Sequence, residues 1–128
     1  MVRDPANPTS KEVFDWAYSS EIEPDQNWEL FLIWKADFES YLNFASDINC
    51  PTENFFLNLL YYWVWRSLKH ELSQTDLSNY KSVFEKAERI NTPYVRIWLT
   101  RTKELIVNNE AFTEEQWYSG RRPYDPTP

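Results

Sequence analysis

The most apolar stretch of the chain runs from Asn54 to Arg66 and reads NFFLNLLYYWVWR. On a helical wheel its bulky apolar side chains occupy most of the circumference, and the polar ones gather on one narrow side. Such a pattern is typical of a helix that packing partners surround, whereas a strand would leave polar residues on both faces. Because Pro51 fits the first turn of a helix, we expect a central, aromatic-rich helix over about residues 52–71. Its polar side would carry Asn54, Asn58, Tyr62, Trp65, Arg66 and Lys69.

Helical periodicity also organises the first third of the chain. Thr9 and Glu12 have the spacing of a capping box, which predicts a short helix through about Ser20. From about Asp25 to Ser46 apolar residues recur every three or four positions, so we expect one long helix there. The polar positions of that helix predict a solvent-exposed edge formed by Asp25, Glu29, Glu39 and Asn43.

Two further helices are predicted in the second half, one from about Asp76 and one from Pro93. A last short turn would be capped by Thr113 and closed by Gly120, and residues 121–128 are expected to be extended or frayed. The pattern therefore predicts an all-α fold, a compact bundle of four main helices plus short terminal ones. We expect one domain over residues 1–128, with an ordered core of about residues 9–119.

Composition narrows the class of protein. The single glycine argues against phosphate-binding loops and tight hairpin turns, and the single cysteine excludes an intramolecular disulfide. The central apolar run has about eleven residues, whereas a membrane-spanning helix needs about twenty. No secretory signal is visible at the N-terminus, so we expect a cytoplasmic protein that does not bind membranes.

The net charge of −7 is unevenly distributed. Residues 1–64 carry three basic and eleven acidic side chains, a balance of −8, whereas residues 65–128 carry ten and nine, a balance of +1. An acidic half repels nucleic-acid phosphate and anionic lipid, and it attracts a basic protein. The alternative is that the charge only keeps an aromatic-rich chain soluble. We expect a basic protein partner and no nucleic acid.

Few residues suggest catalysis. The single histidine, His70, cannot form a multi-histidine metal site, and no nucleophile-elbow or glycine-rich motif occurs. Cys50 and His70 could form a nucleophile and base, but along one helix they would lie on the order of 28 Å apart. We therefore expect Cys50 to be a spacer or cap before the central helix and His70 to be a packed or helix-terminal residue. No catalytic residue, metal or cofactor is predicted.

Asp37 is the exception. In the predicted long helix it falls between Ile33 and Tyr41, inside the broad apolar side. A buried carboxylate is costly unless it is paired, so we expect an ion pair with a basic residue such as Arg66 or Arg101. The alternative is an acid or base with a raised pKa. It would serve a ligand-binding or enzymatic pocket lined by Trp34, Tyr41, Trp63 and Trp98.

The polar side of the central helix combines Tyr62, Trp65 and Arg66. Tyrosine, tryptophan and arginine are enriched in the hot spots of protein interfaces, because each offers a large area with a polar end. These three residues are therefore candidates for partner binding, together with Asp25, Glu29 and Glu39. The alternative is that they pack beneath another helix.

Several short strings resemble a family of small bacterial all-helical proteins of similar length, and the likeness spans about Trp16 to Gly120. They are Trp16-Ala17-Tyr18, Pro24-x-Gln26-x-Trp28-Glu29-Leu30, Ala45-Ser46-Asp47 with Cys50-Pro51, Phe55-Phe56-Leu57 with Leu60-Tyr61, and Trp117. The family has no established activity, so the resemblance implies one domain in a bacterial cytoplasm and transfers no site residue. By analogy with small acidic immunity and antitoxin proteins, we expect a non-enzymatic binding domain that inhibits a basic partner.

Overall fold

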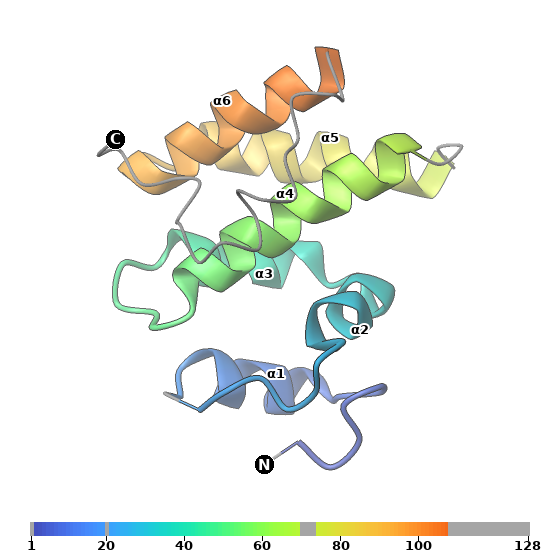
Figure 1. The fold of residues 1–128 in the computed structure, drawn as a ribbon. Helices are drawn as coiled ribbons and strands as arrows, with labels where there is room; N and C mark the ends of the chain where they lie inside the picture. The colour runs from blue at the N-terminus through green and yellow to red at the C-terminus, as the bar shows by residue number, and fades with distance from the viewer. Residues whose placement is uncertain (1, 20, 70–73, 108–128) are drawn as a thin grey trace.

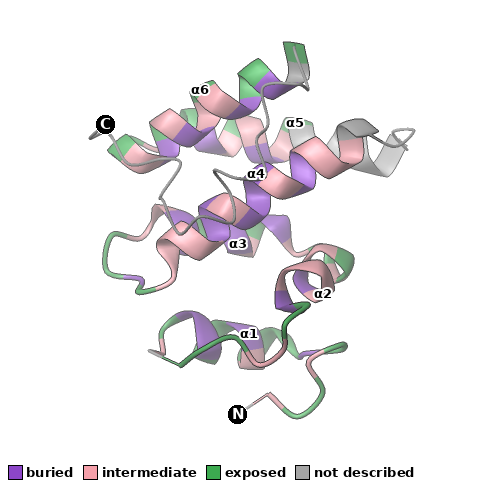
Figure 2. Ribbon diagram, viewed as in Figure 1, coloured by how far each residue is buried: buried purple, intermediate pink, exposed green. Residues whose placement is uncertain are grey.

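Helix α4 (Glu53–Lys69) runs through the middle of the computed structural model, which describes residues 2–19, 21–69 and 74–107 (Figure 1). No residue from 53 to 67 is exposed, and Leu59, Leu60 and Val64 have no exposed area (Figure 2). The less buried positions of α4 include Asn54, Asn58, Tyr62, Trp65 and Arg66. The central aromatic-rich helix predicted from the wheel is confirmed.

Five other helices surround α4 in the described residues, so the all-α prediction is also confirmed. Helices α3 (Phe38–Ser46) and α6 (Pro93–Val107) pack along α4, and α5 (Gln74–Glu88) packs against both of them (Figure 1). The ring of Phe38 on α3 stacks on that of Trp63 on α4, with centroids 3.7 Å apart. Buried side chains from all six helices form a single hydrophobic cluster.

The long helix predicted from Asp25 to Ser46 is wrong. The chain turns through residues 24–27, forms α2 (Trp28–Lys35), breaks at Ala36 and starts again as α3. Ala36 has a φ of 64°, in the left-handed region that ends a helix and that an alanine enters only at an energetic cost.

The break follows from what must be buried. Leu32 and Tyr41 have no exposed area, yet nine residues separate them, which is about 180° on a regular helix. A straight helix would therefore turn one of the two toward solvent. With the break, both face the core, and the Tyr41 hydroxyl donates a hydrogen bond of 2.7 Å to the carbonyl of Leu32 at the end of α2.

Helix α1 (Ser10–Ala17) lies against one end of this core (Figure 1). The predicted capping box is confirmed, because the backbone N–H of Glu12 donates to the Thr9 hydroxyl and the Glu12 carboxylate accepts from the N–H of Thr9. At its other end the carbonyl of Ala17 accepts a hydrogen bond of 2.8 Å from the Thr52 hydroxyl and one of 3.3 Å from the buried Cys50 thiol. Cys50 thus ties the segment before α4 to the end of α1.

Several predictions lie outside the described residues. They concern His70, the turn capped by Thr113 and closed by Gly120, and the extended segment 121–128. The extent of a single domain over residues 1–128 therefore stays a prediction. None of the helices in the described residues is long and apolar enough to cross a bilayer.

The buried position of Leu60 predicts a large loss of stability on truncation. Because the side chain has no exposed area, Leu60→Ala should lower the free energy of unfolding by about 2–5 kcal/mol. Chemical denaturation measures the difference. Ile48→Ala, at a side chain that is 71% exposed, is the matched control and should change stability by less than about 0.5 kcal/mol. Equal losses for the two variants would place α4 outside the core.

Candidate functional site

Helix α1 separates two depressions of the surface, and no residue lines both. The larger one, which we call the N-terminal cleft, has a volume of about 790 Å³ and is lined by Lys11, Asp15 and Trp16 of α1. The smaller one, which we call the α1–α3 groove, has a volume of about 300 Å³ and is lined by Ser10 and Phe14 on the other side of the same helix.

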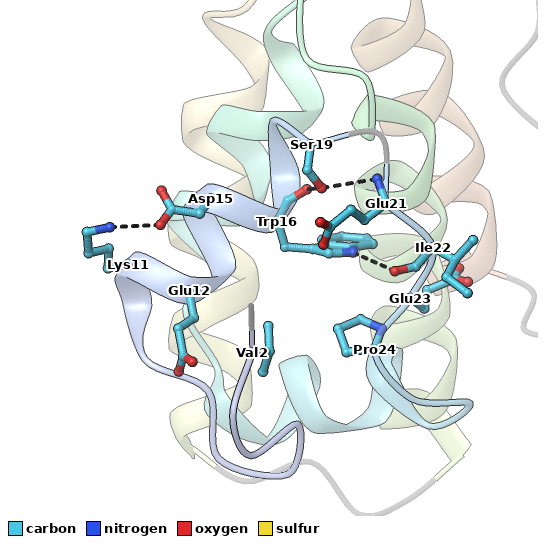
Figure 3. A pocket seen from close by; sticks show the side chains of 10 residues that line it. All are labelled: Val2, Lys11, Glu12, Asp15, Trp16, Ser19, Glu21, Ile22, Glu23 and Pro24. Carbon is cyan, nitrogen blue, oxygen red and sulfur yellow. Dashed lines mark hydrogen bonds and ion pairs between the residues drawn. The ribbon is translucent and has the colours of Figure 1, made fainter.

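The N-terminal cleft is bounded by the segment before α1, by α1 itself and by residues 21–24 (Figure 3). The buried Trp16 holds the far wall in place, because its indole N–H donates a hydrogen bond of 3.1 Å to the carbonyl of Ile22. Of the carboxylates, that of Glu12 accepts backbone N–H groups of Thr9 and Arg3. Those interactions lower the pKa of Glu12. The cleft is acidic, but the carboxylate of Glu12 already stabilises the start of α1 through its bonds to backbone N–H groups.

A cluster of three aromatic rings forms one wall of the α1–α3 groove. The ring centroids of Phe14 and Tyr18, on successive turns of α1, lie 5.0 Å apart, and each lies 6.0 Å from Phe44 of α3. Phe44 is buried, whereas Phe14 is 53% exposed and Tyr18 is 39% exposed. Two aromatic rings in contact with the core are thus accessible from outside.

Tyr18 is fixed in this cluster by its hydroxyl, which donates a hydrogen bond of 2.7 Å to the carboxylate of Asp47. That bond, with a smaller contribution from burial, raises the pKa of Tyr18 to about 12. The same bond lowers the pKa of Asp47, which also accepts the backbone N–H of Asn49. The ring of Tyr18 therefore stands in a defined orientation although it lies at the surface.

The polar wall of the groove comes from α3 and from the residue just before it. Asp37, Ser40 and Asn43 line it at three-residue spacing, which places them along one side of the helix. Asp37 occupies the N-cap position, but its side chain caps no backbone N–H group. The wall therefore offers a carboxylate, a hydroxyl and an amide to the groove.

The prediction that Asp37 forms an ion pair is wrong for the described part of the chain. Its side chain is half-buried, and no lysine or arginine nitrogen among the described residues lies within 4.0 Å of its carboxylate. The physical reason is the break at Ala36, which takes Asp37 out of the apolar face of a continuous helix. A carboxylate at the edge of a solvent-open groove stays hydrated and needs no partner.

The predicted acidic edge does not form one flat surface. Asp25 lies in the turn before α2, where its carboxylate accepts the N–H of Asn27, and Glu29 is half-buried in the first turn of α2. Of the three carboxylates only that of Glu39 is exposed; Glu39 lies on α3, and its carboxylate accepts the hydroxyl of Ser82 on α5. Because α2 and α3 are separate helices, these residues do not share one continuous helix face.

The three binding candidates on α4 lie together. Tyr62, Trp65 and Arg66 are half-buried, and the rings of Tyr62 and Trp65 stack at 5.7 Å. Tyr62 and Trp65 also pack against the hydrophobic cluster. This placement favours the packing interpretation over the interface one, and a role in partner binding stays a prediction.

The alternative pocket lined by four aromatic residues is not formed. Tyr41, Trp63 and Trp98 are buried in the core, whereas Trp34 is 64% exposed on α2. None of the four lines either of the two depressions around α1. Asp37 does line a depression, but its neighbours there are Phe14, Tyr18 and Phe44.

The sequence analysis did not predict that α1 contributes aromatic rings to a groove, although the pattern of its residues indicates it. On a wheel of about 100° per residue, Val13, Trp16 and Ala17 cluster on one side. Phe14 and Tyr18, four residues apart, lie on another side. An eight-residue helix that is aromatic on a second face has more apolar surface than one core contact can bury. This excess of apolar surface could have indicated that Phe14 and Tyr18 stay exposed at the groove.

The lining of the N-terminal cleft includes several carboxylates, whereas that of the α1–α3 groove is mostly neutral and includes aromatic rings. Within residues 2–19, 21–69 and 74–107 no three His, Cys, Asp or Glu side chains are grouped to hold a metal ion. Of the described residues that line the α1–α3 groove, Asp37 is the only charged one. The arrangement suits binding through aromatic faces and one carboxylate.

Glu29 predicts a pH dependence of stability. Burial, with a smaller contribution from repulsion by Glu23, raises its pKa from 4.5 to about 7. The folded state then binds more protons than the unfolded state between these values, so stability should fall as pH rises from 4.5 to about 7. Glu29→Gln should remove about 1–3 kcal/mol of that fall, measured by denaturation at several pH values. Glu85→Gln, at an exposed site, should leave the slope unchanged. An unchanged slope in Glu29→Gln would contradict the assignment.

Comparison of the chain with protein-family models, curated proteins and solved structures finds no match.

Proposed function

We propose that the protein is a non-enzymatic binding protein whose acidic first half engages a basic protein partner. The observation that carries the proposal is the exposure of its carboxylates. None of the eleven acidic side chains of residues 2–64 is buried, and five of them (Asp4, Asp15, Glu21, Glu23 and Glu39) are exposed, against three basic side chains in the same segment. Charge that reaches solvent contributes to the field that a partner meets on approach.

The location of this charge supports a role beyond solubility. The acidic residues surround α1, α2 and α3, where the N-terminal cleft, the α1–α3 groove and the exposed rings of Phe14 and Trp34 also lie. Accessible aromatic rings supply contact area, and the surrounding carboxylates speed the approach of a basic surface. A charge that served solubility alone has no need to coincide with exposed aromatic residues. An inhibitor of a basic toxin or nuclease is the class of protein that this combination suits.

A second candidate function is the binding of a small ligand in the N-terminal cleft. Its volume of about 790 Å³ falls within the range of small-molecule sites, and Trp16, Ile22 and Pro24 provide apolar lining. Ionic strength separates the two functions. Binding of a ligand against apolar walls should respond weakly to salt, whereas association with a basic protein should slow as salt screens the carboxylates.

The proposal predicts a specific effect of charge reversal. A triple variant that replaces the exposed Glu21, Glu23 and Glu39 by lysine should lower the association rate with the partner about tenfold or more at low salt. The reason is the loss of steering, since no buried apolar contact is removed. The partner is first identified by cross-linking and mass spectrometry in the native host, and stopped-flow kinetics with the purified pair then give the rates.

The matched control reverses the same number of exposed glutamates in the second half, Glu85, Glu88 and Glu104. It changes the net charge equally but lies away from α1, and it should affect association much less. If both triple variants associate at the rate of the unmodified protein at low salt, the acidic half is a solubility feature and the proposal fails.

A further inference from the structure

We infer that the α1–α3 groove is a binding site for an arginine side chain of the basic partner. The inference deepens the proposed function and rests on it, because it names the group that the acidic half would recognise. It depends on three features of the groove: accessible aromatic rings, a carboxylate without a partner in the described part of the chain, and a size that suits one side chain.

The aromatic wall provides the surface on which a guanidinium group stacks. Phe14 and Tyr18 expose about half and two fifths of their area, respectively, and both contact the buried ring of Phe44. A planar cation over an aromatic face is attracted by the π electrons, and guanidinium is more weakly hydrated than ammonium. Because the hydroxyl of Tyr18 is held by Asp47, this ring keeps its orientation before a ligand arrives.

The polar wall provides the acceptors that an arginine requires. The Asp37 carboxylate makes no hydrogen bond or ion pair with any described residue, so it can accept two N–H groups of a guanidinium. The hydroxyl of Ser40 and the amide oxygen of Asn43 lie along the same side of α3. A carboxylate that has no partner among the described residues, in a groove that aromatic rings also line, is complementary to a planar cation and not to an anion.

The small volume of the groove favours a single side chain over a larger ligand. Its volume of about 300 Å³ is at the lower end of the range for small-molecule sites. One long side chain from a partner is small enough for such a space, and the negative charge of Asp37 repels the phosphates of nucleotides and anionic lipid headgroups.

A short peptide tests the groove without the partner. The probe is acetyl-Gly-Arg-Gly-amide, and the control peptide carries citrulline in place of arginine, which keeps the shape and removes the charge. Titration of the ¹⁵N-labelled full chain at low salt, followed by ¹H–¹⁵N correlation spectra, should show shifts in α1 and α3 with the arginine peptide. The citrulline peptide should cause none at the same concentration, and a lysine peptide should bind more weakly.

Single substitutions should show how much the polar wall and the aromatic wall each contribute to peptide binding. Asp37→Asn and Phe14→Leu should each weaken peptide binding about tenfold, through loss of the charged acceptor and of the aromatic face, respectively. Phe14→Leu keeps an apolar side chain in the cluster, so thermal unfolding can verify that the fold is retained. The matched control is Asp15→Asn, which removes an aspartate from α1 on the side of the N-terminal cleft and should bind as the unmodified protein does.

Three results would overturn the inference. They are equal binding of the citrulline peptide, equal affinity of the Asp37→Asn and Asp15→Asn variants, and shifts centred on residues 19–24 of the N-terminal cleft. Sedimentation of the protein alone adds a fourth, since a dimer that Asp37→Asn dissociates would mean that a second copy fills the groove. Failure of the peptide test leaves the charge-reversal kinetics unaffected, and failure of those kinetics with peptide binding intact rejects the proposed function alone.

Discussion

The need to cover α4 on every side governs the rest of the structure. A helix that is apolar over most of its circumference is stable in water only when several elements pack around it. Here α2, α3 and α6 pack directly on α4, and the aromatic rings of Trp16 extend the contact to Phe55 and Phe56 from the side of α1. Each helix that covers α4 must turn its own apolar residues inward. The chain therefore bends where a straight helix would leave some of these residues in solvent.

The break at Ala36 is the clearest consequence. Burial of both Leu32 and Tyr41 against α4 outweighs the cost of a left-handed alanine, which is on the order of 1 kcal/mol. Fully burying two such side chains contributes more than that. The same bend takes Asp37 out of an apolar helix face and sets it at the edge of the groove. A packing requirement thus places at the groove the carboxylate on which the binding proposal depends, which has no partner among residues 2–19, 21–69 and 74–107.

The sequence allowed the fold class and the central helix to be predicted, because the pattern of Phe56 to Val64 admits few other arrangements. The capping box of Thr9 and Glu12 was equally readable, since it is a local interaction. The break at Ala36 was not, because no glycine or proline marks it and its cause is a contact between residues nine positions apart. The predictions of a shared acidic edge and of an ion pair at Asp37 were both derived from a straight helix. They are wrong because the chain breaks at Ala36. The groove needs α1 and α3 side by side, which no local pattern specifies.

The packing of the helices around α4 explains why the chain has so many aromatic residues. Nine rings of the described residues, Trp28 and Trp98 among them, are buried and help to fill the core that a chain of 128 residues must build. Phe14 and Tyr18 differ, because α1 already buries Val13, Trp16 and Ala17 on its inner side. Their contacts with Phe44 and the bond from Tyr18 to Asp47 hold α1 against α3, yet both rings keep a large exposed area. That exposed area, beside carboxylates that reach solvent, is what the proposed recognition of a cation would use.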